Sequence, residues 1–223
     1  MIQVNILLLT IIIVTVLVIY SSTQYSKPKE LSHFYRIENI CPALFIINPA
    51  LQKIRAELFM VNSWRDWPEK MLYRDGSWKI IPIFAFGKWC RPYCDQIPTL
   101  TNLLGQIPNL ETALFSRMSA HTILEPHQGW AVLSNKVLRC HLGIDINEVG
   151  KSYVAVGKER QYHENGKWFA FDDSRTHYGC NLSNWTRTIL IVDVTRPNNI
   201  TKGISKVETT DELINIINSI NSK

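Results

Sequence analysis

The sequence has little net charge and no cluster of positive charge. Its 223 residues carry a formal net charge of +5, and the lysines and arginines are scattered along the chain. Proteins that bind a nucleic-acid backbone concentrate basic residues on one surface, often with aromatic residues between them. We therefore expect no nucleic-acid partner. There is also no internal repeat or low-complexity tract, and a hydrophobic content of 46% argues against extensive disorder.

The chain has only five cysteines, which is an odd number. An odd count, in a chain long enough to form its own core, does not suggest a disulfide framework. Two of the cysteines are close enough in sequence for a local disulfide or for half of a zinc site, but no second closely spaced pair of cysteines or histidines completes such a site. The zinc interpretation is therefore the weaker one. The five residues are Cys41, Cys90, Cys94, Cys140 and Cys180.

Charged residues are absent from the beginning of the chain, where Lys27 is the first. Ile2 to Tyr20 is almost wholly apolar, and as a helix this run of 19 residues just spans a bilayer core of about 30 Å. The alternative is a cleaved secretory signal, but no Lys or Arg precedes the run and Tyr20 to Gln24 is a poor cleavage site. We expect an uncleaved transmembrane anchor at residues 1–22, followed by a linker at residues 23–40.

Two opposing features bear on the orientation of this anchor. Basic residues follow the apolar run, and the positive-inside rule then places the following domain in the cytosol. Three glycosylation sequons favour the lumenal side if they are used. Such sequons arise easily in a chain rich in Asn, Ser and Thr, so we expect a single-pass membrane protein with a cytosolic domain. The basic residues are Lys27, Lys29 and Arg36, and the sequon asparagines are Asn181, Asn184 and Asn199.

Helical patterns flank the strands of the domain. Apolar residues recur at helical spacing from Pro49 to Val61, where Asn48 is placed to cap the first turn. A second helix is expected from Ile97 to Leu104, ending near Gly105. We expect both helices to pack on the outside of the strands.

The rest of the domain shows patterns typical of strands separated by turns. Pro82 interrupts the first strand and indicates an edge or a bulge. Thr209 and Glu212 have the spacing of a capping box before an amphipathic C-terminal helix, residues 206–223. Together these patterns indicate an α+β, mainly β domain at residues 41–205, with a barrel or jelly-roll core. The expected strands are Trp78–Phe86, Thr112–Ser119, Leu138–Ile146, Ser152–Val156, Trp168–Phe171 and Thr188–Val194.

Two histidines and an arginine stand out because each is next to strand-like sequence. His127 precedes His177 by 50 residues, and Arg187 follows by 10. Two imidazoles from separate strands of a β-barrel can hold one iron ion, while a cation deeper in the barrel binds the far carboxylate of an anionic cosubstrate. The spacing therefore predicts a non-haem Fe(II), 2-oxoglutarate-dependent oxygenase that also uses O₂.

A carboxylate is missing from the place where it usually completes such an iron site. In sites with two histidines and one carboxylate, Asp or Glu stands two residues after the first histidine, and here that position is Gly129. Glu125 is a conceivable third ligand. Either the metal has only two protein ligands, or His127 and His177 are ordinary hydrogen-bonded side chains, which is the usual fate of a single histidine.

Arg187 enters an otherwise apolar strand, where an unpaired guanidinium is unfavourable. A structural partner for it would be Asp172, Asp173 or Asp193. The functional partner would be a bound carboxylate, held through two hydrogen bonds. Asp172 and Asp173 are also candidates for accepting a hydrogen bond from an imidazole and so orienting it.

Short motifs surround these residues between Phe115 and Pro197. They are Phe115-Ser116-Arg117-Met118, Pro126-His127-Gln128-Gly129, Leu138-Arg139-Cys140-His141-Leu142-Gly143, Gly166-Lys167-Trp168-Phe169-Ala170-Phe171-Asp172-Asp173-Ser174, His177, Arg187 and Ile191-Val192-Asp193-Val194. The segment that they define resembles the catalytic domain of the aspartyl/asparaginyl β-hydroxylase family. The resemblance implies a double-stranded β-helix, jelly-roll or cupin-like, whose iron is held by only two histidines.

The same resemblance implies a role for each matching residue. His127 and His177 match the iron ligands. Ser116 and Arg187 match the groups that hold the distal carboxylate of 2-oxoglutarate. The residues that match positions near the metal-proximal carboxylate or the substrate are Arg139 and His141.

Two departures from the family pattern concern the substrate. Extra residues around Trp130 to Asn135 would alter a loop over the site, and Val137 stands where peptide hydroxylases of the family have a further arginine. We expect hydroxylation of the β-carbon of Asp or Asn in a protein. A lipid acyl chain is the alternative, since Trp130, Val132 and Leu133 could line an apolar trough. An inactive barrel acting as a membrane-tethered binding module and a cupin-like sugar or metal binder are the competing interpretations.

Overall fold

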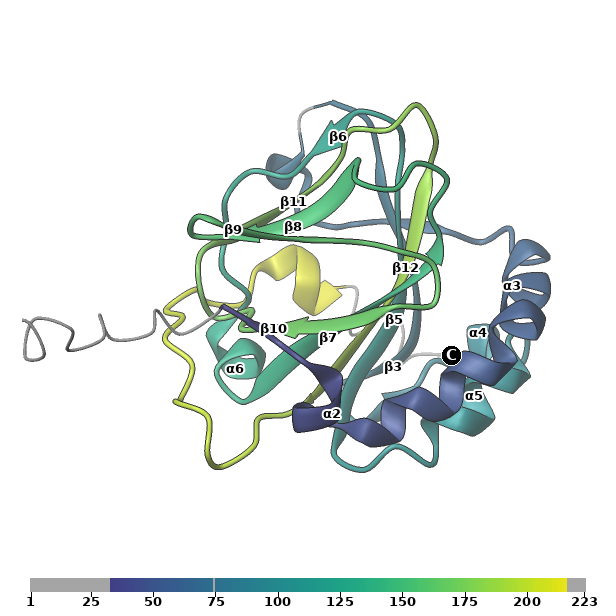
Figure 1. Ribbon diagram of the computed structural model, residues 1–223, viewed down its shortest axis with the longest axis horizontal. Coiled ribbons are helices and arrows are strands. Elements are labelled where there is room, and N and C mark those ends of the chain that lie inside the picture. Colours follow the sequence, from purple (N-terminus) through teal and green to yellow (C-terminus); the bar gives the residue numbers. More distant parts are fainter. Residues whose placement is uncertain (1–32, 74, 216–223) are drawn as a thin grey trace, which may run out of the picture. The chain divides into compact units, whose positions relative to one another are not determined.

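The computed structural model describes residues 33–73 and 75–215 (Figure 1). The expected membrane anchor, residues 1–22, lies outside the described residues. Within the described part of the chain, no helix is both long enough and apolar enough to cross a membrane. Strand β1 (Phe34–Tyr35) falls in the expected linker and pairs with strand β10 (Trp168–Phe171).

Two antiparallel sheets form the core of the domain. Besides β1 and β10, the larger contains β2 (Arg65–Asp66), β3 (Trp78–Ala85), β4 (Lys88–Trp89), β5 (Leu110–Met118), β7 (Val137–Asp145) and β12 (Arg187–Thr195), and the smaller contains β6 (Thr122–Ile123), β8 (Ser152–Val156), β9 (Glu159–Tyr162) and β11 (His177–Asn181). Their orders are β1-β10-β7-β12-β5-β3-β2, with β4 beside β3, and β6-β11-β8-β9. Many neighbouring strands are distant in sequence, as in a jelly roll, so the fold is mainly β and jelly-roll-like.

Short helices cover the outer face of the larger sheet. In Figure 1, α3, α4 and α5 lie beside β3 and β5, away from β8 and β11. Their apolar side chains share one cluster with residues of the sheet, such as Leu44 and Leu100 with Ile81 and Phe115. The helices of this outer layer are α2 (Ile37–Ile40), η1 (3₁₀, Pro42–Ala50), α3 (Leu51–Phe59), α4 (Arg91–Cys94) and α5 (Pro98–Leu104). The short helices η2 (3₁₀, Lys70–Leu72) and α6 (Ala131–Ser134) contribute no residue to this cluster.

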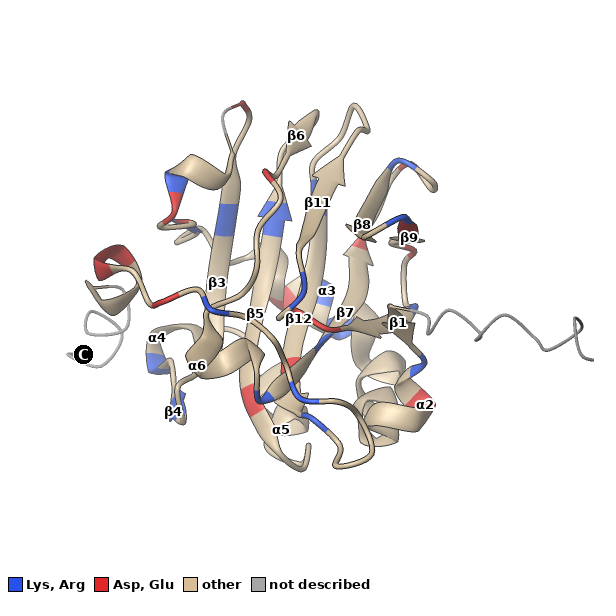
Figure 2. Cartoon of the chain, turned by 90° about the vertical axis from the view of Figure 1, so that its left-hand side faces the viewer, with Lys and Arg blue, Asp and Glu red and all other residues tan. Residues whose placement is uncertain are grey.

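The two faces of the larger sheet carry different side chains. In β12, Leu190 and Val192 belong to the cluster that packs against the helices, whereas Ile189 and Ile191 belong to a second cluster. Side chains alternate between the two faces of a strand. Arg187 therefore lies on the same face as Ile189 and Ile191, which is the interior of the sandwich. Figure 2 shows long stretches of the strands without charged residues.

Several elements predicted from the sequence are confirmed. Strands β8 and β10 have the predicted bounds, and the helix expected from Ile97 to Leu104 is α5. The register of β3 against β5 shifts between Pro82 and Phe84, which confirms the bulge at the proline. Strand β9 was not predicted, because the polar sequence Glu159–Tyr162 has no apolar alternation.

The predicted cap of the first helix is wrong. Helix α3 begins at Leu51 and its N-cap makes no side-chain hydrogen bond, because the preceding 3₁₀ helix runs directly into it and leaves no free first turn. The Asn48 side chain instead donates to the Gly166 carbonyl, at 2.9 Å, and accepts from Trp168 Nε1, at 2.8 Å. Asn48 thus joins the helical layer to the turn before β10.

The C-terminal helix begins one residue later than the capping-box spacing implies. Residues 211–215 are helical, and the Leu213 amide donates to Thr210 Oγ1 at 3.3 Å. Thr210, and not Thr209, is therefore the capping residue. The remainder of the expected helix lies outside the described residues.

All five cysteines are buried and free. Cys90 and Cys94 therefore form no local disulfide. Burial raises the pKa of the Cys90 thiol to about 12. Among the described residues, no further His, Cys, Asp or Glu joins this pair to make a group of three that could hold a metal ion.

Candidate active site

The six residues singled out in the sequence line one cavity between the two sheets. Ser116 comes from β5, and Arg139 and His141 come from β7. Side chains alternate between the two faces of a strand, so every second residue of each strand points into the space between the sheets. The other three residues are His127 after β6, His177 at the start of β11 and Arg187 at the start of β12. The cavity is completed by Trp78, Leu124, Val154, Phe171, Gly179 and Ile191.

The two imidazoles are held side by side by backbone contacts. His127 and His177 form an isolated antiparallel bridge, and their ring centroids are 4.5 Å apart. Each Nδ1 lies 2.8 Å from a carbonyl oxygen two residues earlier in the chain, that of Glu125 or of Arg175. A carbonyl can only accept, so each Nδ1 carries the proton and each Nε2 keeps a lone pair. Of the two carboxylates considered as acceptors for an imidazole, Asp173 lies near His177, with its Oδ1 3.3 Å from Nε2 and not from Nδ1.

Both imidazoles are suited to bind a metal. Burial, with His177 nearby, lowers the pKa of His127 to about 4, and burial also lowers the pKa of His177 to about 4. Both rings are thus neutral near pH 7, the form in which histidine is a metal ligand. The donor set fits a metal that is bound by two imidazoles and keeps other positions open.

No third protein ligand joins the two histidines. A side chain at Gly129 would collide with the Asp173 carboxylate, so this position has no room for an aspartate. The Glu125 side chain lines a different pocket, described below. Among the residues that the structure describes, no three His, Cys, Asp or Glu side chains gather in a way that could hold a metal ion.

Arg139 lies beside the imidazoles, bound by two carboxylates. It binds both oxygens of Asp193, at 2.8 and 2.9 Å, and its Nη1 lies 2.6 Å from Asp173 Oδ1. Asp173 Oδ1 is in turn 3.3 Å from His177 Nε2. Burial alone would lower the pKa of Arg139, but the two carboxylates outweigh it and hold this pKa above its ordinary value.

Arg187 lies in the same cavity without a carboxylate partner among the described residues. Only 4% of it is exposed. Its Nη1 is 3.4 Å from the carbonyl and the hydroxyl of Ser116, its Nη2 is 2.7 Å from Met118 Sδ, and its Nε has no partner. Burial lowers its pKa to about 9.

The structural partners considered for Arg187 are all bound elsewhere. Asp173 and Asp193 pair with Arg139. Asp172 pairs with Arg196 at 2.6 Å. A buried guanidinium with unfilled donors fits a carboxylate that enters the cavity as a ligand.

Two residues that the sequence did not single out position cavity side chains. Trp78 Nε1 donates to Ser116 Oγ at 3.0 Å. His163 Nε2 lies 3.1 Å from His141 Nδ1. Nothing in the sequence near Trp78 or His163 signals these contacts, because they depend on which strands are neighbours.

A family model for aspartyl/asparaginyl beta-hydroxylase matches residues 49–197. The chain belongs to this family. The membership predicted from the motifs is thereby confirmed.

Individual relatives are similar over parts of their length. The ornithine lipid ester-linked acyl 2-hydroxylase of Rhizobium tropici is 31% identical over 129 residues, which are 57% of this chain and 45% of that protein. The chain thus spans less than half the length of this relative. Among solved structures, a 2OG-Fe(II) oxygenase-family oxidoreductase from Burkholderia pseudomallei has a TM-score of 0.46 at 14% identity, covering 71% of this chain and 82% of its own. HygX from Streptomyces hygroscopicus, with nickel and 2-oxoglutarate bound, has a TM-score of 0.46 at 10% identity, covering 77% and 85%.

The two positions at which we expect this chain to depart from the family pattern are both described by the structure. The segment expected to carry extra residues includes helix α6, and Val137 is fully buried at the start of β7. Trp130, just before α6, stacks on Trp67 with ring centroids 5.5 Å apart. The loop over the site is therefore anchored by aromatic packing.

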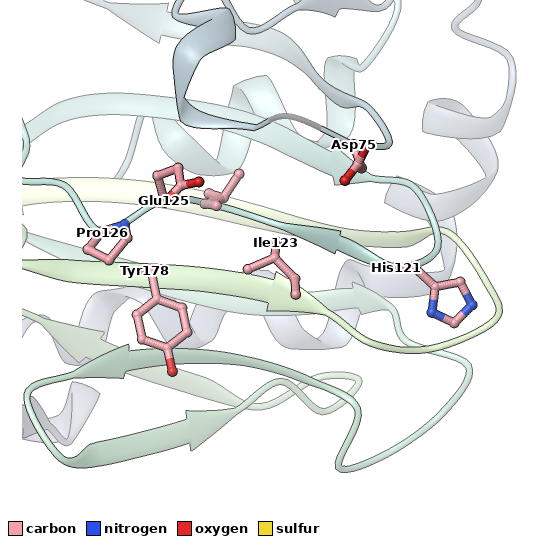
Figure 3. Close-up of a pocket in the computed structure, with 7 residues that line it drawn as sticks. Asp75, His121, Ile123, Glu125, Pro126 and Tyr178 are labelled. Carbon is pink, nitrogen blue, oxygen red and sulfur yellow. The ribbon is translucent and has the colours of Figure 1, made fainter.

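A second pocket lies on the other face of the smaller sheet (Figure 3). Its volume is about 350 Å³, and the side chains labelled in Figure 3 include Glu125, Ile123 and Tyr178. Tyr178 follows His177 in β11 and therefore faces away from the cavity. With one imidazole, that of His121, this pocket has no counterpart of the histidine pair.

Proposed function

We propose that this member of the aspartyl/asparaginyl β-hydroxylase family is an Fe(II)- and 2-oxoglutarate-dependent dioxygenase that hydroxylates an unactivated C–H bond. The observation that carries the proposal is the unpaired cation Arg187 in the same cavity as the imidazole pair of His127 and His177. Neither an inactive barrel that acts as a binding module nor a cupin-like sugar binder would explain why such a cation is buried. An inactive module remains the outcome if no turnover is found.

In this proposal His127 and His177 hold the iron through Nε2. Arg187 and Ser116 bind the distal carboxylate of 2-oxoglutarate. Trp78 donates to Ser116 Oγ, so the serine's own hydroxyl proton is free to be donated to that carboxylate. The planar fork of Arg187 matches a carboxylate through two hydrogen bonds.

When bound, iron with 2-oxoglutarate and O₂ supplies the oxidant, so that one oxygen atom ends in the substrate hydroxyl and the other in succinate, as CO₂ is released. The chain's own contribution is to orient the reactants and to exclude water. Leu124, Val154, Phe171 and Ile191 give the cavity apolar walls. Such walls strengthen the electrostatic contacts of the few polar groups inside.

For the substrate, we propose a lipid acyl chain ahead of an Asp or Asn side chain in a protein. A substrate carboxylate needs a free cation, but Arg139 is already bound by Asp193 and Asp173. Val137 adds no charge. The acyl substrate named for the Rhizobium tropici relative also supports this choice.

An apolar pocket next to the cavity supports the same choice. Arg139 lines both of them, so the pocket begins close to the imidazoles. A substrate acyl chain whose reacting carbon lies near the iron would place the rest of its alkyl tail in this pocket. Its other lining residues include Ile80, Leu114, Trp130 and Leu133.

Mass spectrometry of lipids and proteins from cells that express the wild type or His177→Ala tests the proposal. We expect a gain of one oxygen on acyl chains, dependent on His177. An oxygen found only on Asp or Asn of proteins would establish the protein substrate instead. Absence of both, with no succinate formed from 2-oxoglutarate, would favour the inactive module.

A pair of neighbouring substitutions tests the apolar pocket. Leu133 lines it, whereas Val132 is 53% exposed and does not. We expect Leu133→Glu to lower acyl hydroxylation strongly and Val132→Glu to leave it near the wild-type level. Equal activity of the two variants would argue against a tail in this pocket.

For location, we propose that residues 1–22 anchor the enzyme in a membrane as a single span, with the domain in the cytosol. Of the three sequons, Asn181 is unsuited to carry a glycan, because it is fully buried and its amide donates to the carbonyls of Met118, Ser119 and Trp185. The full chain should stay in membranes after carbonate extraction. A soluble form that lacks the apolar segment, or a glycosidase-sensitive mass shift at Asn184 or Asn199, would contradict this proposal.

A further inference from the structure

Three buried polar side chains form a line that ends at the cavity. Ser152 Oγ lies 3.0 Å from His163 Nδ1, and His163 Nε2 lies 3.1 Å from His141 Nδ1. Ser152 and His163 are each 1% exposed, and His141 is 5% exposed. His141 Nε2 is buried without a hydrogen-bond partner, and His141 lines the cavity. The line therefore leaves one ring nitrogen available to a ligand.

The direction of the hydrogen bonds follows from the serine. Within the described part of the chain, the only partner of Ser152 Oγ is His163 Nδ1. A buried hydroxyl that merely accepted from this nitrogen would leave its own proton unpaired, which is unfavourable. Ser152 therefore donates to His163 Nδ1.

The tautomers of both histidines are then determined. Burial and neighbouring Arg187 keep the pKa of His163 well below its ordinary value, and burial and His163 do the same for His141, so both rings are neutral. A neutral imidazole that accepts at Nδ1 carries its proton on Nε2. His163 thus donates from Nε2 to His141 Nδ1, and His141 in turn carries its proton on Nε2.

We infer that Ser152 and His163 are positioning residues that make His141 a hydrogen-bond donor toward a carboxylate of 2-oxoglutarate. The inference rests on the proposed function. In the opposite tautomer, His141 would present a lone pair to an anionic ligand and repel it. With His141 Nε2–H and the guanidinium of Arg187, the cavity offers two separate donors to a dicarboxylate.

The backbone fixes this line independently of any ligand. The His163 amide donates to the Ser152 carbonyl at 2.9 Å, next to the pairing of β8 with β9. The rings of His141 and His163 are nearly parallel, at 21°, and both lie against Phe169. The line of Ser152, His163 and His141 is therefore held in place before any ligand binds.

Nitrogen NMR of the metal-free full chain, labelled with ¹⁵N-histidine in detergent, tests the inference directly. Long-range proton–nitrogen correlations distinguish a protonated ring nitrogen from a bare one. We expect the proton of His141 on Nε2 in the wild type, and a mixture of tautomers in Ser152→Ala. A wild-type His141 with its proton on Nδ1 would overturn the inference, even if the enzyme turns over 2-oxoglutarate.

Binding of 2-oxoglutarate to the Mn(II)-loaded full chain, measured by calorimetry, provides the second test. His163→Leu removes the group that donates to His141 Nδ1. We expect the affinity of this variant for 2-oxoglutarate to fall roughly 10- to 100-fold, the range for a lost hydrogen bond to a charged group. In His163→Gln the side-chain amide can donate from the place of Nε2, so most of the affinity should return. The control is His121→Leu, because the His121 ring hydrogen-bonds to Asn184 and does not line the cavity. Equal affinities of the Leu and Gln variants would contradict a role in setting the tautomer, whereas absence of binding in the wild type would count against the proposed function itself.

Discussion

His127 and His177 exchange two backbone hydrogen bonds, each 2.9 Å long, although 50 residues separate them in the chain. These bonds do not involve the imidazoles, so the loop after β6 stays attached to β11 whatever the two side chains are. The backbone thus fixes the distance between the imidazoles before any metal binds. Such preorganisation is what a metal site with only two protein ligands requires.

Alanine at either histidine should abolish iron binding without unfolding the domain. The paired backbone groups remain in His127→Ala and His177→Ala, and each variant loses one of two ligands. We expect wild-type circular dichroism, no Fe(II) bound in an anaerobic titration and no succinate formed. His121→Ala is the matched control and should bind iron normally. Wild-type turnover in both alanine variants would show that the site has been misplaced.

Arg187→Lys should weaken 2-oxoglutarate binding far more than metal binding. The ammonium keeps the charge but lacks the planar fork that meets a carboxylate through two bonds. Loss of one charge-assisted hydrogen bond predicts a roughly tenfold or greater rise in Kd. Calorimetric titrations of metal and cosubstrate measure the two affinities separately. Equal affinity for 2-oxoglutarate in both proteins would make Arg187 a purely structural residue.

Arg187→Met should stabilise the ligand-free protein, by about 1–4 kcal/mol, because it removes a buried charge with no carboxylate partner. Folding lowers the pKa of Arg187 to about 9, so the folded state releases this proton before the unfolded state does as the pH rises. The unfavourable charge is fully present below about pH 9, and it is relieved as the pH rises above that value. The gain in free energy of unfolding from Arg187→Met should therefore shrink as the pH rises above about 9. Urea unfolding at several pH values checks it, and a destabilised Met variant at pH 7 would contradict the argument.

Gly129→Asp should not create a third iron ligand. Its Cβ would collide with the Asp173 carboxylate, which also contacts Arg139 and His177. We expect a loss of stability of about 1–3 kcal/mol from this overpacking, together with weaker iron binding. Gly105→Asp is the control, since a Cβ there meets only ordinary contacts, the nearest at 3.6 Å. Tighter iron binding by Gly129→Asp would refute the steric argument.

Asp193→Asn should destabilise the fold strongly, because Arg139 would keep only Asp173 as a charged partner. Removing one member of a buried ion pair costs about 3–5 kcal/mol. Asp66→Asn is the matched control. It disrupts the exposed pair with Lys70, and such pairs contribute at most about 1 kcal/mol. Denaturant midpoints of the two variants give the comparison, and similar values would mean that Arg139 is not held by Asp193.

Strands β3, β5, β7, β8, β10 and β12 were predictable because each is a mainly apolar run bounded by turn residues, whereas β9 and β11 have no such pattern and were not predicted. Sequence periodicity also assigns side chains to faces, as Ile189 and Ile191 show in β12. It does not show which strands are neighbours. The helix cap at Asn48 was mispredicted because the Asn48 side chain accepts a hydrogen bond from Trp168, 120 residues away, and local sequence does not show such a contact.

The sequence by itself determined the family and the three residues on which the site depends, because the motifs around His127, His177 and Arg187 are local and specific. Only the tertiary structure decided what their neighbours do. Whether Arg139 is free or bound to Asp193 depends on β7 lying beside β12, a pairing that no local pattern specifies. The line from Ser152 through His163 to His141 likewise exists only where strands of the two sheets meet. Hydrogen bonds over such separations are set by sheet order and register, which the packing of the whole domain fixes.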